Sequence, residues 1–241
     1  MENSDKQNKI IGMFDDIAST YDTANRVLSF GIDKQWRRKG CDKAYEMLGK
    51  NKISQIIDVA CGTGDLLLYW KDRATKKGII VDKYIGIDPS VGMLDVAKHK
   101  VEFAEFIEGQ ANDMPFEDES CEIVSISYGI RNVVDRKKGL SEFYRVLKPG
   151  GIVVILEFTK QEKSGIASKI VDIYMKNILP AIGGLVSKNY AAYKYLPDSI
   201  EEFLTTKMLE QELRDVGFEI KYTKSFSLGI STLIVAQKPQ S

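Results

Sequence analysis

The chain has 241 residues, which suits one α/β domain with additions better than two independent domains. Its 34 lysines and arginines balance 34 aspartates and glutamates, so no overall field favours a polyanion, and a nucleic-acid partner is not expected. Three well-separated cysteines argue against a disulfide framework, and neither a secretory signal nor a run of about 18 apolar residues is evident. We therefore expect a cytoplasmic protein that at most touches the inner face of a membrane.

The first fifty residues are predicted to form a helical lid or packing segment, because Met13, Phe14, Ile17 and Tyr21 fall on one helical stripe. From about residue 50, short β-branched runs alternate with amphipathic stretches. The predicted strands are 54–60, 83–88, 104–109, 121–128 and 151–158, and the helices between them are 65–75, 90–100 and 135–147. This alternation predicts an α/β fold, with a mostly parallel sheet covered by helices on both faces.

The last part of the chain departs from this rhythm. KPGG at 148–151 predicts a tight turn between helix and strand, and the apolar stretch 164–195, which contains Pro180, predicts a helical insertion over the sheet. A helix at 198–215 precedes two final strands at the sheet edge, which are predicted to form an antiparallel hairpin, at 217–226 and 229–239. The single domain thus divides into an N-terminal helical segment, a core, an insertion, and a C-terminal helix with a strand pair, at 1–50, 51–160, 161–197 and 198–241.

DVACGTGDLL at 58–67 contains the turn after the first core strand, where ligands bind in sheets of this kind. Gly62 and Gly64 allow the backbone to approach a ligand closely. A dinucleotide fingerprint would have a third glycine where this chain has Leu67, which argues against NAD or FAD. A P-loop is excluded because no lysine followed by serine or threonine comes after the glycines. The turn therefore favours a nucleoside ligand without a pyrophosphate.

The next two strands carry polar residues suited to such a ligand. Asp88 ends the second core strand, where a carboxylate can accept hydrogen bonds from both ribose hydroxyls. A strand-end aspartate is, when considered alone, more often a helix cap. After the third strand, Asn112 and Asp113 are placed to meet the adenine edge. The three features, in order on successive strands, favour the nucleoside site over capping.

Together, D-x-x-C-G-T-G-D, Asp88 and the Asn112–Asp113 pair resemble the class I S-adenosylmethionine-dependent methyltransferases. Within that class, the chain resembles the demethylmenaquinone and polyprenyl-benzoquinol C-methyltransferases over nearly its whole length. The stretches that carry this resemblance are SYGIRNVVDRKKGLSEFYRVLKPGGIVVILEF, FDDIASTYD, YLPDSIEEF and GISTLIVAQKP. The resemblance implies a Rossmann-like sheet, S-adenosylmethionine as cofactor, a prenylated quinol as substrate and no metal. It also implies cofactor contacts from Gly62, Thr63, Gly64, Asp88, Asn112, Asp113 and Ser127. Cys61 stands where glycine is also common in the family.

Methylation of a ring carbon requires electron density there, which a quinol hydroxyl provides as its proton leaves. Arg131 and Asn132 follow the fourth strand and are the catalytic candidates, because they can orient or stabilise a quinol oxygen. The alternative is that Arg131 pairs with a carboxylate and Asn132 caps the helix at 135. Tyr21 and Asp22 can close over the cofactor, although packing is the simpler explanation for Tyr21. His99 is expected to be a solvated surface residue, so the general base stays unidentified.

Two segments are candidates for membrane contact. The basic cluster Lys34, Arg37, Arg38 and Lys39 can meet anionic lipid, although such a run is usually a solvated helix face. The apolar insertion, 166–195, is expected to receive a prenyl tail. The alternatives to a quinol methyltransferase are a methyltransferase acting on another small molecule or lipid, and a non-catalytic cofactor-binding assembly protein. The identity of the ring, the length of the prenyl tail and the oligomeric state are left open.

Overall fold

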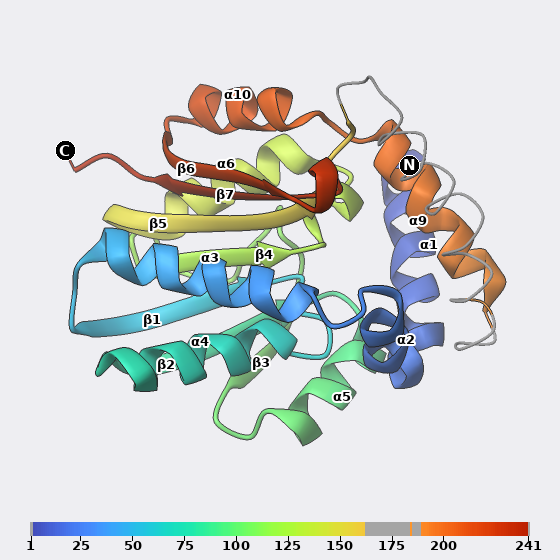
Figure 1. The fold of residues 1–241 in the computed structure, drawn as a ribbon, viewed down its shortest axis with the longest axis horizontal. Coiled ribbons are helices and arrows are strands. Elements are labelled where there is room, and N and C mark those ends of the chain that lie inside the picture. The colour runs from blue at the N-terminus through green and yellow to red at the C-terminus, as the bar shows by residue number, and fades with distance from the viewer. Residues whose placement is uncertain (1, 162–183, 185–188, 241) are drawn as a thin grey trace.

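A computed structural model describes residues 2–161, 184 and 189–240 (Figure 1). Its strands form one seven-stranded sheet in the order β3-β2-β1-β4-β5-β7-β6. Strands β1 to β5 run parallel, and β7 lies antiparallel between β5 and β6. The strands span Lys52–Val59 (β1), Ile80–Asp88 (β2), Glu105–Glu108 (β3), Cys121–Ser127 (β4), Leu147–Phe158 (β5), Glu219–Phe226 (β6) and Ser231–Gln237 (β7). The predicted fold class, including the antiparallel final hairpin, is confirmed.

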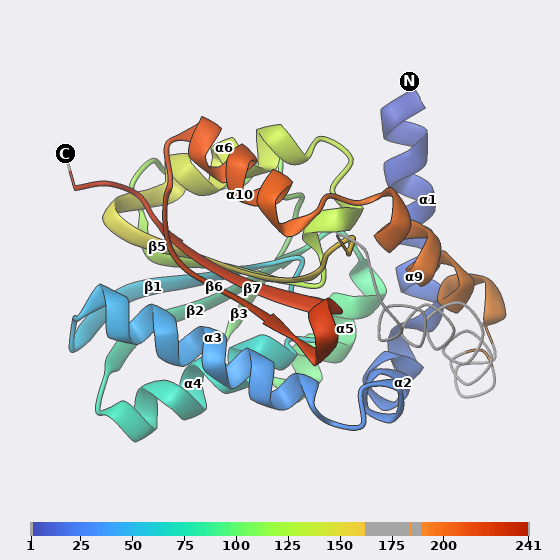
Figure 2. The same ribbon diagram turned by 45° about the horizontal axis from the view of Figure 1, so that its top comes forward.

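Helices cover both faces of the sheet (Figure 2). In that view α6 and α10 lie above it and α3 and α4 below, while α1, α2 and α9 gather at one end. The α-helices span Glu2–Ile17 (α1), Tyr21–Leu28 (α2), Asp33–Leu48 (α3), Asp65–Lys77 (α4), Val91–Lys100 (α5), Arg136–Val146 (α6), Tyr190–Glu202 (α9) and Thr206–Val216 (α10). Short 3-10 turns span Ala18–Thr20 (η1), Ile130–Asn132 (η2) and Ser227–Gly229 (η4).

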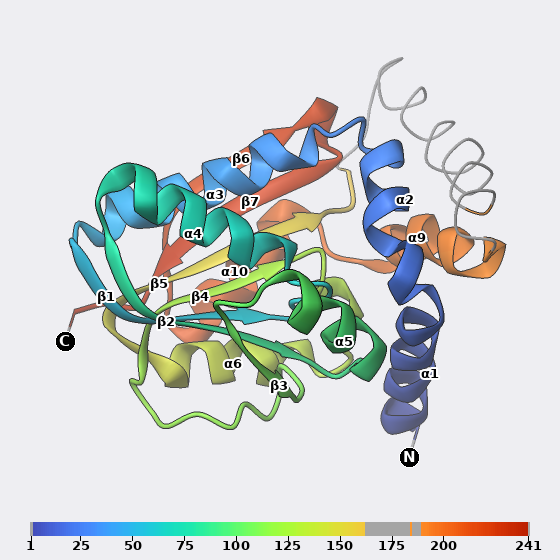
Figure 3. The same ribbon diagram turned by 90° about the horizontal axis from the view of Figure 1, so that it is seen from below.

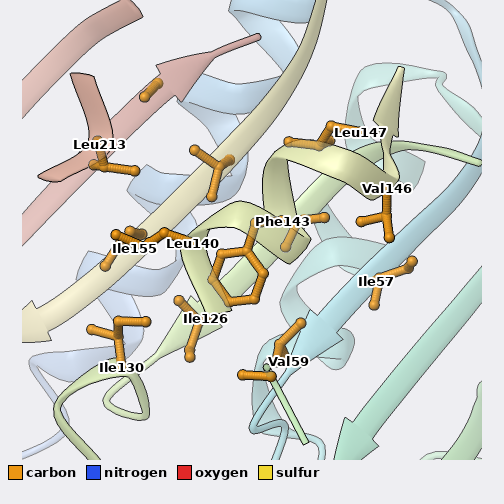
Figure 4. Packing of buried hydrophobic residues seen from close by; sticks show 14 of the residues in the cluster. Ile57, Val59, Ile126, Ile130, Leu140, Phe143, Val146, Leu147, Ile155 and Leu213 are labelled. Carbon is orange, nitrogen blue, oxygen red and sulfur yellow. The ribbon is translucent and has the colours of Figure 1, made fainter. Parts of the chain in front are cut away.

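The core lies on the two faces of the sheet. On one face, Phe143 and Leu140 of α6 pack against Ile126, Ile155 and neighbouring strand residues (Figure 4). On the other face, Trp70 of α4 is fully buried, and its indole N–H donates to Ser125 Oγ at 3.0 Å. Ser125 Oγ in turn donates to Asp58 Oδ1 at 2.7 Å. A buried tryptophan usually needs such a partner, so this bond fixes α4 on β4, and Ser125 links it to Asp58 of β1 just before the glycine turn.

Two predicted boundaries are wrong. KPGG does not form a free turn: α6 ends at Val146, β5 begins at Leu147, and the left-handed Gly150 (φ +77°) is accommodated within the strand. The predicted helix at 198–215 is two helices. The break falls before α10, where Thr205 Oγ1 accepts the N–H of Met208 and caps a new helix. Threonine in this role starts helices and does not continue them, which the apolar spacing alone did not reveal.

Helices α1, α2 and α9 stand at the end of the sheet to which the parallel strands point, as seen from below in Figure 3. Most of the predicted insertion, 161–197, lies outside the described residues; its described end includes the start of α9, capped by Asn189. In the described part of the chain, each helix is too short or too polar to span a bilayer.

Candidate functional site

The turn between β1 and α4 adopts the conformation that its glycines permit. Ala60, Gly62 and Gly64 all have positive φ, at +49°, +54° and +78°. A Cβ on Gly62 would meet no atom within 4 Å, so this glycine serves backbone conformation and leaves open space beside it. A Cβ on Gly64 would come within 3.0 Å of Val101, so this glycine serves close packing. Gly62 therefore serves backbone conformation alone, whereas Gly64 serves both conformation and close packing on Ala97 of α5 and on Val101, which follows α5.

Asp88 is buried at the end of β2, and both of its carboxylate oxygens accept backbone N–H groups. Oδ2 accepts from Gly62 at 2.8 Å and Oδ1 from Ser90 at 2.9 Å. Burial raises the pKa of Asp88 to about 6, with the two backbone N–H groups opposing that rise and Asp15 adding to it. Each carboxylate oxygen retains a second lone pair, so the group can still accept hydrogen bonds from a ligand.

A cavity of about 700 Å³, including space open to solvent, lies at the carboxyl ends of β1, β2 and β4. Four of the predicted cofactor residues line it, namely Gly62, Asp88, Asn112 and Ser127. The Ser127 hydroxyl is buried and has no hydrogen-bond partner among the described residues. Such a group is costly unless a ligand completes it. Together with the acceptor Asp88, it fits a nucleoside that presents hydroxyl and amine groups. Helix α1 contributes Gln7, Ile10, Ile11 and Phe14 to the wall.

Three predicted cofactor residues do not line this cavity. Thr63 Oγ1 donates to Asp22 Oδ1 of α2 at 2.6 Å. Gly64 packs against α5, as described above. Asp113 is exposed, and its N–H donates to Gln110 O at 3.2 Å. After β3 it is therefore Gln110, Ala111 and Asn112 that border the cavity.

A second, larger and mainly apolar cavity of about 1150 Å³, including space open to solvent, adjoins the first. Phe14, Tyr21 and Tyr128 line both cavities, so the two meet at these three side chains. Met13, Phe14, Ile17 and Tyr21 all line this cavity, but they do not form one helical stripe, because α1 ends at Ile17 and Tyr21 begins α2. Helices α2, α3 and α9 supply most of the remaining wall, among them Leu28, Trp36, Tyr193 and Leu196.

The two catalytic candidates lie on different sides of this junction. Arg131 lines the larger cavity and Asn132 the smaller. Arg131 Nη1 donates to Glu157 Oε1 and to Tyr128 O, both at 2.7 Å, so the ion pair considered as the alternative to a catalytic role exists at the cavity wall. Asn132 does not cap α6, since Asp135 does so itself, and Asn132 Oδ1 accepts the Tyr195 hydroxyl at 2.9 Å. Both side chains are thus held by partners while lining a cavity.

Several residues of the site were missed from the sequence. Tyr128 follows β4 with φ +59°, a strained conformation for a tyrosine, and stacks on Phe158 with ring centroids 4.4 Å apart. Asp15 of α1 accepts hydrogen bonds from Ser90 Oγ at 2.6 Å and Gly92 N at 2.9 Å, so it fastens α1 to the start of α5. No short motif signals either role, because each depends on a partner distant in sequence.

The basic residues expected at the surface are only partly exposed. His99 is exposed on α5, as expected. Arg37 is not part of a solvated face: it is buried, pairs with Asp33 and lines the larger cavity. Of its predicted cluster, Lys34 and Arg38 are exposed. The basic run is therefore not one surface, because the helix turns Arg37 inward by its position in the 3.6-residue period.

Solved structures of other methyltransferases share this fold. An S-adenosylmethionine-dependent methyltransferase from Thermotoga maritima matches with a TM-score of 0.60 at 19% identity, over 95% of this chain and 99% of that one. Another from Aquifex aeolicus matches with a TM-score of 0.56 at 16% identity, over 82% of this chain and 89% of that one. At such identities the likeness shows the fold alone.

Relatives of known name are much closer in sequence. The ubiquinone/menaquinone biosynthesis C-methyltransferase UbiE of Campylobacter jejuni is 53% identical over 233 residues, 97% of this chain and 99% of the relative. The demethylmenaquinone methyltransferase of Thermus thermophilus is 39% identical, over 94% of this chain and all of the relative. The model of the ubiE/COQ5 methyltransferase family matches residues 2–238. The chain therefore belongs to the ubiE/COQ5 methyltransferase family, and its methyl donor is S-adenosylmethionine.

Proposed function

We propose that the protein transfers a methyl group from S-adenosylmethionine to a ring carbon of a prenylated quinol, such as demethylmenaquinol or a polyprenyl benzoquinol. The observation that carries this proposal is the pair of adjoining cavities. The smaller one presents Asp88 and an unsatisfied Ser127 hydroxyl, and the larger one is mainly apolar with an arginine in its wall. The names of the relatives support a quinone-pathway substrate.

In the smaller cavity, Asp88 accepts the ribose hydroxyls, Asn112 borders the adenine, and Ser127 completes its hydrogen bonding with the cofactor. Gly62 leaves room for it. Three other residues act indirectly. Thr63 acts through its hydrogen bond to Asp22, Gly64 through packing on α5, and Asp113 through the loop after β3. When bound, S-adenosylmethionine supplies an electrophilic methyl group.

In the larger cavity, Arg131 stabilises the quinol oxygen as it becomes a phenolate, which raises electron density at the adjacent ring carbon. Its hydrogen bonds to described residues use the backbone N–H, Nε and Nη1, and leave Nη2 for a ligand. Glu157 and Tyr128 O hold the guanidinium in place. Asn132, oriented by Tyr195, holds the ring oxygen from the cofactor side.

Tyr21 acts as a hydrogen-bond donor at the junction of the cavities. Burial raises the pKa of its phenol, although Arg131, Asn25 and Arg37 oppose that rise. A phenol with a raised pKa is neutral at neutral pH, so Tyr21 is suited to donate to the substrate oxygen and is a poor general base.

The prenyl tail leaves through the apolar rim of the larger cavity. Phe30 is 77% exposed and Ile32 is also exposed, and both line that cavity. Leu228, 71% exposed, is adjacent in sequence to the lining residue Ser227. Exposed apolar side chains at the mouth of a cavity suit a substrate that comes from a lipid surface, so peripheral membrane contact is part of this proposal. The sequence-predicted tail site, 166–195, lies mostly outside the described residues.

The proposal is tested by incubating the purified protein with labelled S-adenosylmethionine and quinols of both ring types and several tail lengths. We expect label on the ring carbon, with KM rising much more than kcat falls as the tail is shortened, because the tail is bound alike in ground and transition states. Transfer to another class of small molecule would favour the first alternative. Cofactor binding without transfer to any acceptor would favour a non-catalytic assembly protein.

The affinity for S-adenosylmethionine should depend on pH through Asp88. In the free protein the folded pKa of about 6 lies above the unfolded value, so this carboxyl stabilises the fold most at low pH and loses that contribution as pH rises through 6. Bound ribose hydroxyls donate to the charged carboxylate, so cofactor binding favours the ionised form of Asp88 and should lower its pKa. Calorimetric titration should therefore show affinity constant above pH 7 and falling by up to about tenfold per pH unit below 6. Asp88→Asn should bind more weakly above pH 7 and lack this dependence; an unchanged pH profile in that variant would exclude Asp88 as the titrating contact.

A further inference from the structure

A second arginine, Arg37 of α3, faces the larger cavity with incomplete hydrogen bonding. Its side chain is 8% exposed, and Asp33 Oδ2 accepts from its Nη1. Its buried Nε has no hydrogen-bond partner among the described residues. A buried N–H of a charged group left without an acceptor costs more than an ordinary hydrogen bond is worth. A ligand in this cavity that carries an acceptor oxygen would remove that cost.

Arg37 and Arg131 lie over the two rings of one aromatic pair. Cζ of Arg37 is 5.3 Å from the centroid of the Tyr128 ring, and Cζ of Arg131 is 5.6 Å from that of Phe158. The two rings stack on each other, and all four side chains line the same cavity. The cavity thus offers two separate guanidinium groups beside a flat aromatic surface.

A quinol ring carries two oxygens on opposite sides, which one guanidinium cannot reach together. Only the oxygen next to the methylated carbon activates that carbon. Arg131 suits this oxygen, since its neighbour Asn132 lines the cofactor cavity, whereas Asp33 and Trp36 beside Arg37 line only the larger one. Building on the function proposed above, we propose that Arg37 binds the far oxygen and selects rings that carry both.

An ion-pair network fixes Arg37 in this position. Asp33, which holds Arg37, also accepts hydrogen bonds from Ser29 Oγ at 2.7 Å and from Arg26 Nη1. Arg26 Nη2 donates to Asp65, the first residue of α4 after the glycine turn. Arg37 is therefore connected through two salt-bridged residues to the cofactor turn. A guanidinium held in this way loses little freedom when it binds a ligand.

The test compares two acceptors that differ by one oxygen. One is a short-tailed demethylated naphthoquinol, and the other is the naphthol that keeps only the hydroxyl beside the reacting carbon. Arg37→Gln should lower kcat/KM for the quinol by about 10- to 100-fold and leave the naphthol unchanged. Arg38→Gln serves as the matched control, because Arg38 is exposed on the same helix over the Tyr69 ring, and should change neither. Arg37→Lys, which keeps the charge, should show an intermediate loss confined to the quinol.

Other outcomes would overturn the inference. An equal loss on both acceptors, in the Gln and Lys variants alike, would make Arg37 a purely structural ion pair. Retained preference for the quinol in both variants would show that the far oxygen is bound elsewhere. If the wild-type protein methylates the naphthol and the quinol equally well, the inference fails while the proposed function stands. If it methylates neither, nor any longer-tailed quinol, both fail.

Discussion

Replacing Arg131 by glutamine is expected to destabilise the folded protein by about 3 to 5 kcal/mol, because it leaves a buried carboxylate without its cation. Glu157 is fully buried, and the Arg131 side chain is 6% exposed. Burial already raises the pKa of Glu157, and Arg131 is the main influence that lowers it. Without Arg131 the carboxyl should bind a proton at neutral pH. Since its folded pKa then lies far above the unfolded value, the loss measured by denaturant unfolding should shrink as pH falls.

A second substitution separates stability from catalysis. In Arg131→Gln/Glu157→Gln the buried charge is gone, so most of the lost stability should return. Activity should stay low by about 100- to 1000-fold, the usual effect of removing a donor that stabilises an oxyanion. Arg214→Gln is the control, because the exposed Arg214 pairs with Glu210 one helical turn away and should contribute only a few tenths of a kcal/mol. Recovered activity in the double variant would mean that Arg131 only supports the fold.

The sequence is sufficient for the fold and for the backbone around the smaller cavity. The alternation of apolar runs predicted strands β1 to β5 within a few residues, because buried parallel strands must be apolar on both faces. Gly62, Asp88, Asn112 and Ser127 were all placed at strand ends, where parallel topology brings them together. The local sequence pattern is enough to locate residues at strand ends, since their position follows from the order of strands and helices along the chain.

Residues whose role depends on a distant partner were not predictable in this way. Arg37 belonged to a basic run that is usually solvated, and only the fold shows that Asp33 and the cavity accommodate it. The sequence does not identify the carboxylate that could pair with Arg131; in the fold, β5 places Glu157 beside it. Asp113, adjacent to a cavity residue, is exposed because the loop after β3 turns away at that point. The hydrophobic periodicity of helices and strands shows which face of an element is apolar. It does not identify the polar partner that a distant part of the chain supplies.

A group of charges around Lys100, at the end of α5, fastens the N-terminal helix α2 to the core. Lys100 Nζ donates to Asp22 Oδ2 and to Asp65 Oδ1, both at 2.6 Å, and to Thr63 Oγ1 at 3.2 Å. Asp22 belongs to α2, whereas Thr63 lies in the glycine turn and Asp65 begins α4. Lys100 therefore holds α2 against the core by pairing with Asp22 and Asp65, and it shares the neutralisation of Asp65 with Arg26.

Lys100→Gln is expected to weaken S-adenosylmethionine binding by about 2 to 3 kcal/mol, roughly 30- to 150-fold in Kd, because Asp22 of α2 then loses this cation and faces Asp65, which keeps its ion pair with Arg26. Most of this change should appear as faster dissociation in stopped-flow displacement, since α1 and Tyr21 wall the cofactor cavity and must move before the cofactor leaves.

The unfolding free energy of the core should change little, because Lys100 lies at the end of a helix and is 24% exposed. Lys98→Gln is the matched control: Lys98 is on the same helix, pairs among the described residues with Asp95 at 3.9 Å, and should leave dissociation unchanged. Raising the ionic strength should speed dissociation from the wild-type protein toward the rate of the variant, because these partly exposed charges are screened by salt. Equal dissociation rates for wild type and Lys100→Gln at low salt would show that packing of α1 alone retains the cofactor.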